Sequence, residues 1–257
     1  MNKPILFCLC MSLLGSFYTA ASQLKGTEFE AKFSSEKIEI DGQMSEASWQ
    51  QGDWYPMFED MIGQPINKQD FNGRFKLRWD NGHLYLLAEI TDDVLFDQHA
   101  DPLFLYWDDD CLEVFIDEDR SGGNHQFNYN AFAYHIALDN QVVDIGEKTK
   151  QNPEPFLTLN DHVKSVWKRS ATSPNTIIWE LAIKVYDDTF KPELDTAPVQ
   201  LHEGKKLGFM LAYCDNDGSK SRENFVGSTS IKPVNGDKNL GYITADVFAN
   251  LTLVKAQ

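Results

Sequence analysis

The chain has 257 residues, 42% of them hydrophobic, and a formal net charge of −16 from 39 acidic and 23 basic residues. This length and hydrophobic content suit one large globular domain with its own core. The acidic balance argues against a protein that binds nucleic acid or anionic lipid surfaces, and it is compatible with neutral ligands such as sugars and with divalent cations.

The N-terminal residues 1–22 combine Lys3, an apolar run over 5–14 and small residues at 19–22. This order is typical of a secretory signal peptide, and the run is too short for a membrane-spanning helix. We therefore expect a secreted or periplasmic protein, without membrane insertion, in which residues 23–257 form a single domain.

Strand patterns dominate the rest of the chain. Residues 75–79 and 83–90 place apolar side chains on alternate positions on either side of Asn81-Gly82. This pattern predicts a β-hairpin, because both central positions of an Asn-Gly turn favour positive φ. Further strand-like segments follow at 111–117, 127–138, 176–184, 206–214 and 250–255.

Helical signals are limited to single turns at 45–50 and 185–190. Turn residues fall between short strands throughout, and no internal repeat is visible. The sequence therefore predicts an all-β fold, an antiparallel β-sandwich.

The segment 106–132 is strand-like and yet crowded with carboxylates, among them Asp108, Asp109, Asp110, Glu113, Asp117 and Asp119. A metal site, an acid/base pair, a cup for a polar ligand and a solvated edge are all compatible with this cluster. A glycoside-processing enzyme would place two carboxylates on either side of a sugar. The motifs of other enzyme classes are missing from the sequence, which favours a non-catalytic site.

A second acidic stretch spaces Asp215, Asp217 and Glu223 like an oxygen-rich calcium loop, and Gly218 permits a sharp turn. Asp and Asn are also common turn formers, so the alternative is an ordinary surface turn. We expect Ca²⁺ here in a structural role, as the only cofactor.

Cys111 and Cys214 are the cysteines of the exported part, and each ends a strand-like run. They form either a disulfide or two buried thiols, since a domain of this size does not need a bridge. Two cysteines alone do not supply the four ligands of a structural zinc site.

Trp107 precedes the acidic strand in a loop that contains Pro102. Such a tryptophan either stacks on the apolar face of a sugar ring or covers the end of the sandwich. In the first case, nearby carboxylates and amides would bind the sugar hydroxyls.

Five segments resemble, in order, the carbohydrate-binding modules of family 9, which are found appended to xylanases. They are IEIDGQMSEASWQ (38–50), FKLRWDNGHLYLLAEITDD (75–93), WDDDCLEVFID (107–117), KLGFMLAYCDND (206–217) and FANLTLVK (248–255). The resemblance extends over about residues 36–255 and implies a β-sandwich that binds the ends of oligo- or polysaccharide chains.

The same resemblance implies particular binding residues. Trp107 and Tyr242 would flank the sugar ring, while Glu113, Asn128 and Asn130 would bind its hydroxyls. It also implies calcium ions that support loops, and polysaccharide-degrading enzymes as partners.

The pocket residues depart from the family pattern at three positions. Asn128 replaces an arginine, Tyr242 replaces a tryptophan and Ala212 replaces a glutamine. A changed polar set implies a changed sugar specificity. The alternatives are a haem-binding sandwich of an electron-transfer system, through Met210 and His135, and a glycoside-processing enzyme.

Overall fold

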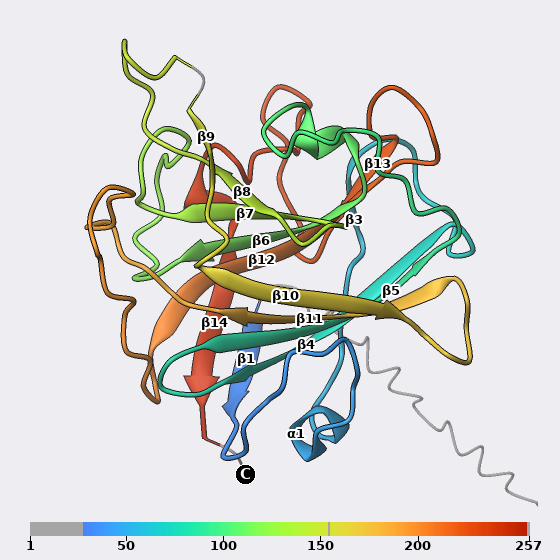
Figure 1. Ribbon diagram of the computed structural model, residues 1–257, viewed down its shortest axis with the longest axis horizontal. Helices are drawn as coiled ribbons and strands as arrows, with labels where there is room; N and C mark the ends of the chain where they lie inside the picture. The colour runs from blue at the N-terminus through green and yellow to red at the C-terminus, as the bar shows by residue number, and fades with distance from the viewer. Residues whose placement is uncertain (1–27, 154, 256–257) are drawn as a thin grey trace, which may run out of the picture.

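The computed structural model describes residues 28–153 and 155–255 (Figure 1). The predicted signal peptide, residues 1–22, lies outside these described residues. No helix within them is long and apolar enough to cross a lipid bilayer.

The described residues form 14 strands, one short α-helix and two 3₁₀ turns. The strands are β1 (Glu28–Phe33), β2 (Tyr55–Pro56), β3 (Glu59–Ile62), β4 (Phe71–Trp79), β5 (Leu84–Asp92), β6 (Cys111–Asp117), β7 (Phe132–Ala137), β8 (Val142–Ile145), β9 (Phe156–Thr158), β10 (Val163–Arg169), β11 (Thr176–Ile183), β12 (Lys206–Asp215), β13 (Asn224–Gly227) and β14 (Ala249–Val254). The helix is α1 (Ala47–Gln50), and the 3₁₀ turns are Tyr106–Asp108 and Ala245–Val247.

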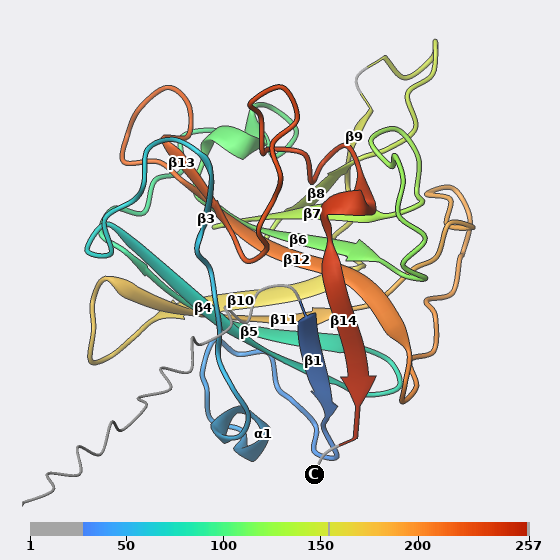
Figure 2. The same cartoon turned by 180° about the vertical axis from the view of Figure 1, so that it is seen from behind.

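The strands form one curled sheet with two facing layers. The first layer has the order β10-β11-β5-β4, and the second has the order β14-β12-β6-β7-β8-β9. Strand β1 joins them, and Figure 2 shows it beside β14. The predicted β-sandwich is confirmed, except that β1 pairs in parallel with both β4 and β14, so the sheet is mixed and not antiparallel throughout.

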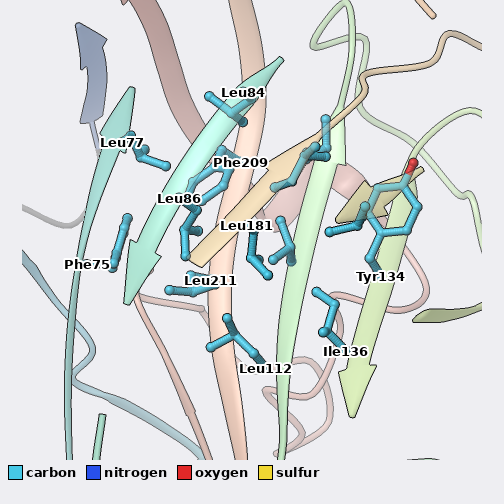
Figure 3. Packing of buried hydrophobic residues seen from close by; sticks show 14 of the residues in the cluster. Phe75, Leu77, Leu84, Leu86, Leu112, Tyr134, Ile136, Leu181, Phe209 and Leu211 are labelled. Carbon is cyan, nitrogen blue, oxygen red and sulfur yellow. The ribbon is translucent and has the colours of Figure 1, made fainter. Parts of the chain in front are cut away.

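The main core lies between the two layers (Figure 3). Leu77, Leu86 and Leu181 from the first layer face Leu112 and Leu211 from the second, and all five are buried. Burying such side chains contributes roughly 1.5–3 kcal/mol each. This core explains why the alternating apolar positions of β4, β5, β6, β11 and β12 were readable in the sequence.

The second layer is also covered on its outer face. All seven residues of β6 are buried. On its outer face, Phe115 of β6 packs in one apolar cluster with Met210, Phe225 and Ile231. The carboxylate of Glu113, on the same outer face, is therefore not on a solvated edge. This covered outer face positions the candidate site.

Two expected elements differ from the prediction. The strand expected at 127–138 is limited to β7, because the backbone N–H of Asn130 donates to Oδ1 of Asn128 and the chain turns before it. Residues 185–190 form no helix, only a turn in which Phe190 donates to the carbonyl of Asp187. The turn expected at 45–50 is confirmed as α1.

Candidate functional site

A pocket of about 390 Å³ opens on the outer face of the second layer. Strands β6, β7 and β8 supply Glu113, His135 and Asp144. The 3₁₀ turn Tyr106–Asp108, strand β9 and the surrounding loops supply aromatic side chains, namely Tyr106, Trp107, Phe127, Phe156 and Tyr242. The pocket thus combines aromatic walls with a charged floor.

The aromatic wall is a packed cluster. The ring of Tyr106 lies 5.0 Å from Trp107, 5.4 Å from Phe156 and 4.7 Å from His135, all edge to face. Trp107 is half-buried, so part of its ring stays free for a ligand. Phe127 is 41% exposed at the pocket and carries Lys148 over its ring.

Glu113, on the floor of the pocket, contacts three neighbouring polar side chains. Its Oε1 lies 3.1 Å from Nδ1 of His135 and 3.3 Å from Nη1 of Arg222, and it accepts a hydrogen bond from the thiol of Cys214. Burial alone would raise the pKa of Glu113, but His135 and Arg222 outweigh burial and lower it below its ordinary value. Glu113 is therefore an ionised acceptor that faces the pocket.

Asp144 is a second buried carboxylate in the same pocket. Its two oxygens accept hydrogen bonds from the backbone N–H groups of Ala133 and Ile145. Burial raises the pKa of Asp144 to about 7, because these bonds do not outweigh the cost of desolvating the charge. Near neutral pH this group can therefore donate as well as accept a hydrogen bond.

Of the predicted binding residues, Trp107, Glu113 and Tyr242 meet in this pocket. Asn128 and Asn130 are not among its lining residues. Their amides instead donate to the carbonyls of Asn124 and Gly122, which shapes the loop.

Sequence reasoning missed Arg222. It stands in the stretch assigned to a calcium loop, and its guanidinium reaches Glu113 from there. The sequence signal that could have identified it is a basic side chain, Arg222, within a stretch whose other candidate ligands are acidic.

The haem alternative rested on Met210 and His135 as candidate ligands. Met210 is fully buried in the apolar cluster on the outer face, against Phe115, and a Cβ added to Gly241 would lie 2.7 Å from its Cε. Among the described residues it does not line the pocket, whereas His135 does. The pocket therefore does not combine these two side chains.

The predicted calcium residues fall into two neighbouring clusters. Asp215 joins Asp92 and Asp110 in a buried cluster, with one oxygen of each within 4.8 Å of the others. Asp217 joins Asp70 and Asp93 in a more exposed one. Glu223 acts electrostatically on Asp70 and Asp217 without joining either cluster.

The buried aspartates repel one another. Burial is the main cause that raises the pKa of Asp92 to about 6, of Asp215 to about 7 and of Asp110 to about 9. The charge of Asp92 adds to the rise at Asp215 and Asp110, whereas Asp93 and Asp217 add to the rise at Asp92 itself. Within residues 28–153 and 155–255, Oδ1 of Asp215 and Oδ1 of Asn224 are buried without a hydrogen-bond partner. Such orphaned oxygens suit a hard cation.

Comparison with known proteins places this geometry in context. A family model described as carbohydrate family 9 binding domain-like matches residues 40–256. No curated protein matches the chain.

Three solved structures share the fold. A family 9 carbohydrate-binding module from Caldicellulosiruptor kristjanssonii in complex with cellotriose is 18% identical, with a TM-score of 0.63 over 90% of this chain and 95% of that one. A family 9 module from the same organism in complex with glucose is also 18% identical, with a TM-score of 0.62 over 90% of this chain and 97% of that one. A putative carbohydrate-binding protein from Bacteroides uniformis is 14% identical, with a TM-score of 0.51 over 89% of this chain and 99% of that one.

Proposed function

Because this chain belongs to the carbohydrate family 9 binding domain-like family, we propose that it binds a carbohydrate chain end without cleaving it. The ring would lie between Trp107 and Tyr242, with its hydroxyls toward Glu113. The observation that carries this proposal is that these three side chains, from separate segments, line one pocket.

The pocket has the chemistry that a sugar ring requires. A ring face is partly apolar, and an aromatic side chain buries about 150–250 Å² when it packs. Hydroxyls donate to Glu113 and accept from Arg222, and hydrogen bonds to charged groups contribute roughly 1.5–3 kcal/mol each. A volume of about 390 Å³, near the lower end of the usual range for ligand pockets, favours one end of a chain over an internal segment.

The cellotriose and glucose held by the similar modules suggest a β-linked glucan end as the first ligand to test. The changed positions, Asn128, Ala212 and Tyr242, argue for a different preference. A glycan array with the purified protein would identify the sugar.

The direct test is calorimetric titration of Trp107→Ala with the selected glycan. We expect binding to weaken about 10- to 100-fold, because the stacking surface is lost. Trp54→Ala is the matched control: Trp54 is also half-buried, but it packs under Arg74 and Lys76, away from the pocket. Parent-like binding by Trp107→Ala would overturn the proposed pocket.

Hydrolysis is the second candidate function, and one observation favours it. Glu113 is ionised, while Asp144 in the same pocket has a raised pKa of about 7. An ionised and a protonated carboxyl are the pair that a glycosidase requires. New reducing ends released from the bound glycan, and lost in Asp144→Asn, would support hydrolysis in place of simple binding.

We also propose a structural Ca²⁺ held by Asp92, Asp110 and Asp215. The orphaned Oδ1 of Asp215 and the mutual repulsion of the three carboxylates support this assignment. A bound calcium would neutralise the cluster and join β5, β12 and the segment before β6.

The place of action follows from the N-terminal pattern. Residues 1–22 predict export, so we propose that the protein works in the periplasm or outside the cell, beside enzymes that degrade polysaccharide. Fractionation of cells that express the full chain would test the location.

A further inference from the structure

The pocket floor contains a second set of converging side chains, which has only Glu113 in common with the proposed sugar contacts. Across the β6–β12 pair, Cys111 lies opposite Cys214. Across the β6–β7 pair, Glu113 lies opposite His135. Since Cys111 and Glu113 are two residues apart on one strand, all four side chains share the outer face of the sheet.

Their donor atoms meet around one point. One ligand atom of each of Cys111, Glu113, His135 and Cys214 lies within 4.8 Å of the other three. Sγ of Cys111 is 3.8 Å from Nδ1 of His135, which is 3.1 Å from Oε1 of Glu113, and this oxygen is 3.2 Å from Sγ of Cys214. A tetrahedral zinc site requires donor-to-donor distances of roughly 3.3–3.8 Å.

From this convergence we propose that Cys111, Cys214, His135 and Glu113 bind one Zn²⁺ beneath the sugar pocket. Sulfur, nitrogen and oxygen donors in a four-ligand set are the combination that zinc accepts. This site goes beyond the proposed sugar binding and does not depend on it.

The surroundings of His135 support the assignment. Its Nε2–H donates to the carbonyl of Tyr106 at 2.6 Å, so Nδ1 is the nitrogen that points at the cluster, where zinc would replace its proton. Zinc-binding histidines usually donate their other N–H in this way, which fixes the ring and the tautomer. The backbone of the aromatic wall thus orients the ligand.

Arg222 supplies the balancing charge. Two thiolates and one carboxylate carry three negative charges, zinc carries two positive charges and the guanidinium carries one. Nη1 of Arg222 lies 2.9 Å from Sγ of Cys214 and 3.3 Å from Oε1 of Glu113, close enough to neutralise the site. A buried metal site without net charge avoids a large desolvation cost.

The competing state is a disulfide, which the geometry explains less completely. Both cysteines are free thiols in this structure. A bridge would use the two sulfurs alone and would leave the convergence of His135 and Glu113 unexplained. An access route exists, because Glu113 and His135 both line the open pocket.

The experiment is a zinc titration of the reduced, metal-free full-length protein in competition with a chromophoric chelator. We expect one zinc per chain, with a cobalt-substituted form that shows sulfur-to-metal charge-transfer absorption. Removing an outer partner of a metal ligand costs about 10–100-fold in affinity, so Cys214→Ser and His135→Gln should each lose at least about 100-fold. His202→Gln, at an exposed histidine outside the pocket lining and the acidic clusters, is the matched control for His135→Gln and should bind zinc like the parent.

Three results would overturn the site. These are the absence of charge-transfer absorption in the cobalt-loaded parent, zinc binding unchanged in Cys214→Ser, and a Cys111–Cys214 disulfide in protein isolated from cells. The cobalt spectrum of the parent decides the question even if a variant fails to fold. Glycan titration of zinc-free protein tests the sugar pocket separately, so the two proposals can fail independently.

Discussion

Glu113 and Asp110 stand three residues apart in one acidic run, and yet their surroundings push them in opposite directions. Glu113 lies beside His135 and Arg222, which lower its pKa although it is buried. Asp110 lies beside Asp92 and Asp215, and burial together with their charges raises its pKa to about 9. Carboxylate density alone therefore does not define a site, because the partner charges decide what each carboxylate can bind.

This difference assigns two kinds of ligand to one short segment. On the floor of the pocket the guanidinium of Arg222 lies beside Glu113, so Glu113 stays ionised, as both the contact with sugar hydroxyls and the proposed zinc ligation require. Within residues 28–153 and 155–255, no lysine, arginine or histidine forms an ion pair with Asp92, Asp110 or Asp215, so this cluster suits a metal ion. The following predictions test that contrast, beginning with the largest expected effect.

Glu113→Gln should lower the free energy of unfolding more than the loss of an exposed carboxylate does. The change leaves Arg222 and His135 without their buried counter-charge, and breaking a buried pair costs about 3–5 kcal/mol of unfolding free energy. Urea denaturation would measure this loss. Glu147→Gln removes a more exposed pair with Lys191 and should cost no more than about 1 kcal/mol. Equal losses of unfolding free energy in the two variants would show that burial does not make the Glu113 pair more important for stability than the exposed pair.

Removal of calcium should destabilise the folded protein, because the three aspartates of the cluster then repel one another without a bound cation. A cation present at a hundredfold excess over its Kd stabilises the folded state by about 2.7 kcal/mol. We therefore expect a chelator to lower the melting temperature and added calcium to restore it. In Asp110→Asn the response should be strongly reduced. A melting temperature indifferent to chelator and to calcium would contradict the site.

The pH dependence of the calcium-free protein sharpens the same test. A carboxyl whose pKa rises on folding contributes stability below its unfolded pKa near 4 and loses it as pH rises through the folded pKa. With folded values of about 6, 7 and 9 for Asp92, Asp215 and Asp110, the melting temperature should fall between pH 5 and pH 8. Calcium should flatten this slope, and a slope unaffected by calcium would argue against binding at these residues.

The smallest effect concerns Asp144. A neutral sugar that covers this carboxyl desolvates it further and favours the protonated form, so affinity should fall a few-fold as pH rises through about 7. Calorimetry at pH 6 and pH 8 would measure the change. Asp144→Asn should bind equally at both values, and a pH dependence retained in this variant would exclude Asp144 as its source.

Much of the fold was readable from the sequence. Alternation in 75–79, 83–90, 111–117 and 206–214 predicted strands that are present, and the family resemblance is confirmed by the match over residues 40–256. The parallel pairing of β1 was not readable, because it joins residues near 30 to residues near 250 without a local signal.

The site was only partly readable. Trp107 and Glu113 could be predicted to lie in the pocket because they stand in one short motif. Asp92 and Asp110 were missed as companions of Asp215, since three distant segments bring them together. Asn128 was assigned to the pocket as if its segment were a strand, and the turn that its own side chain stabilises directs it elsewhere.

The position of β1 also bears on how the molecule assembles. Glu28 pairs with Asn250 and Lys32 with Val254, so β1 cannot complete its pairing until the residues of β14 have been synthesised. Contacts of such long sequence separation form slowly, and until they form the edges of β1 and β12 that β14 covers remain unpaired and prone to aggregate. A chain truncated before Ala249 would retain these open edges permanently. Quality control by chaperones and proteases would therefore act most strongly on chains that have not yet acquired β14.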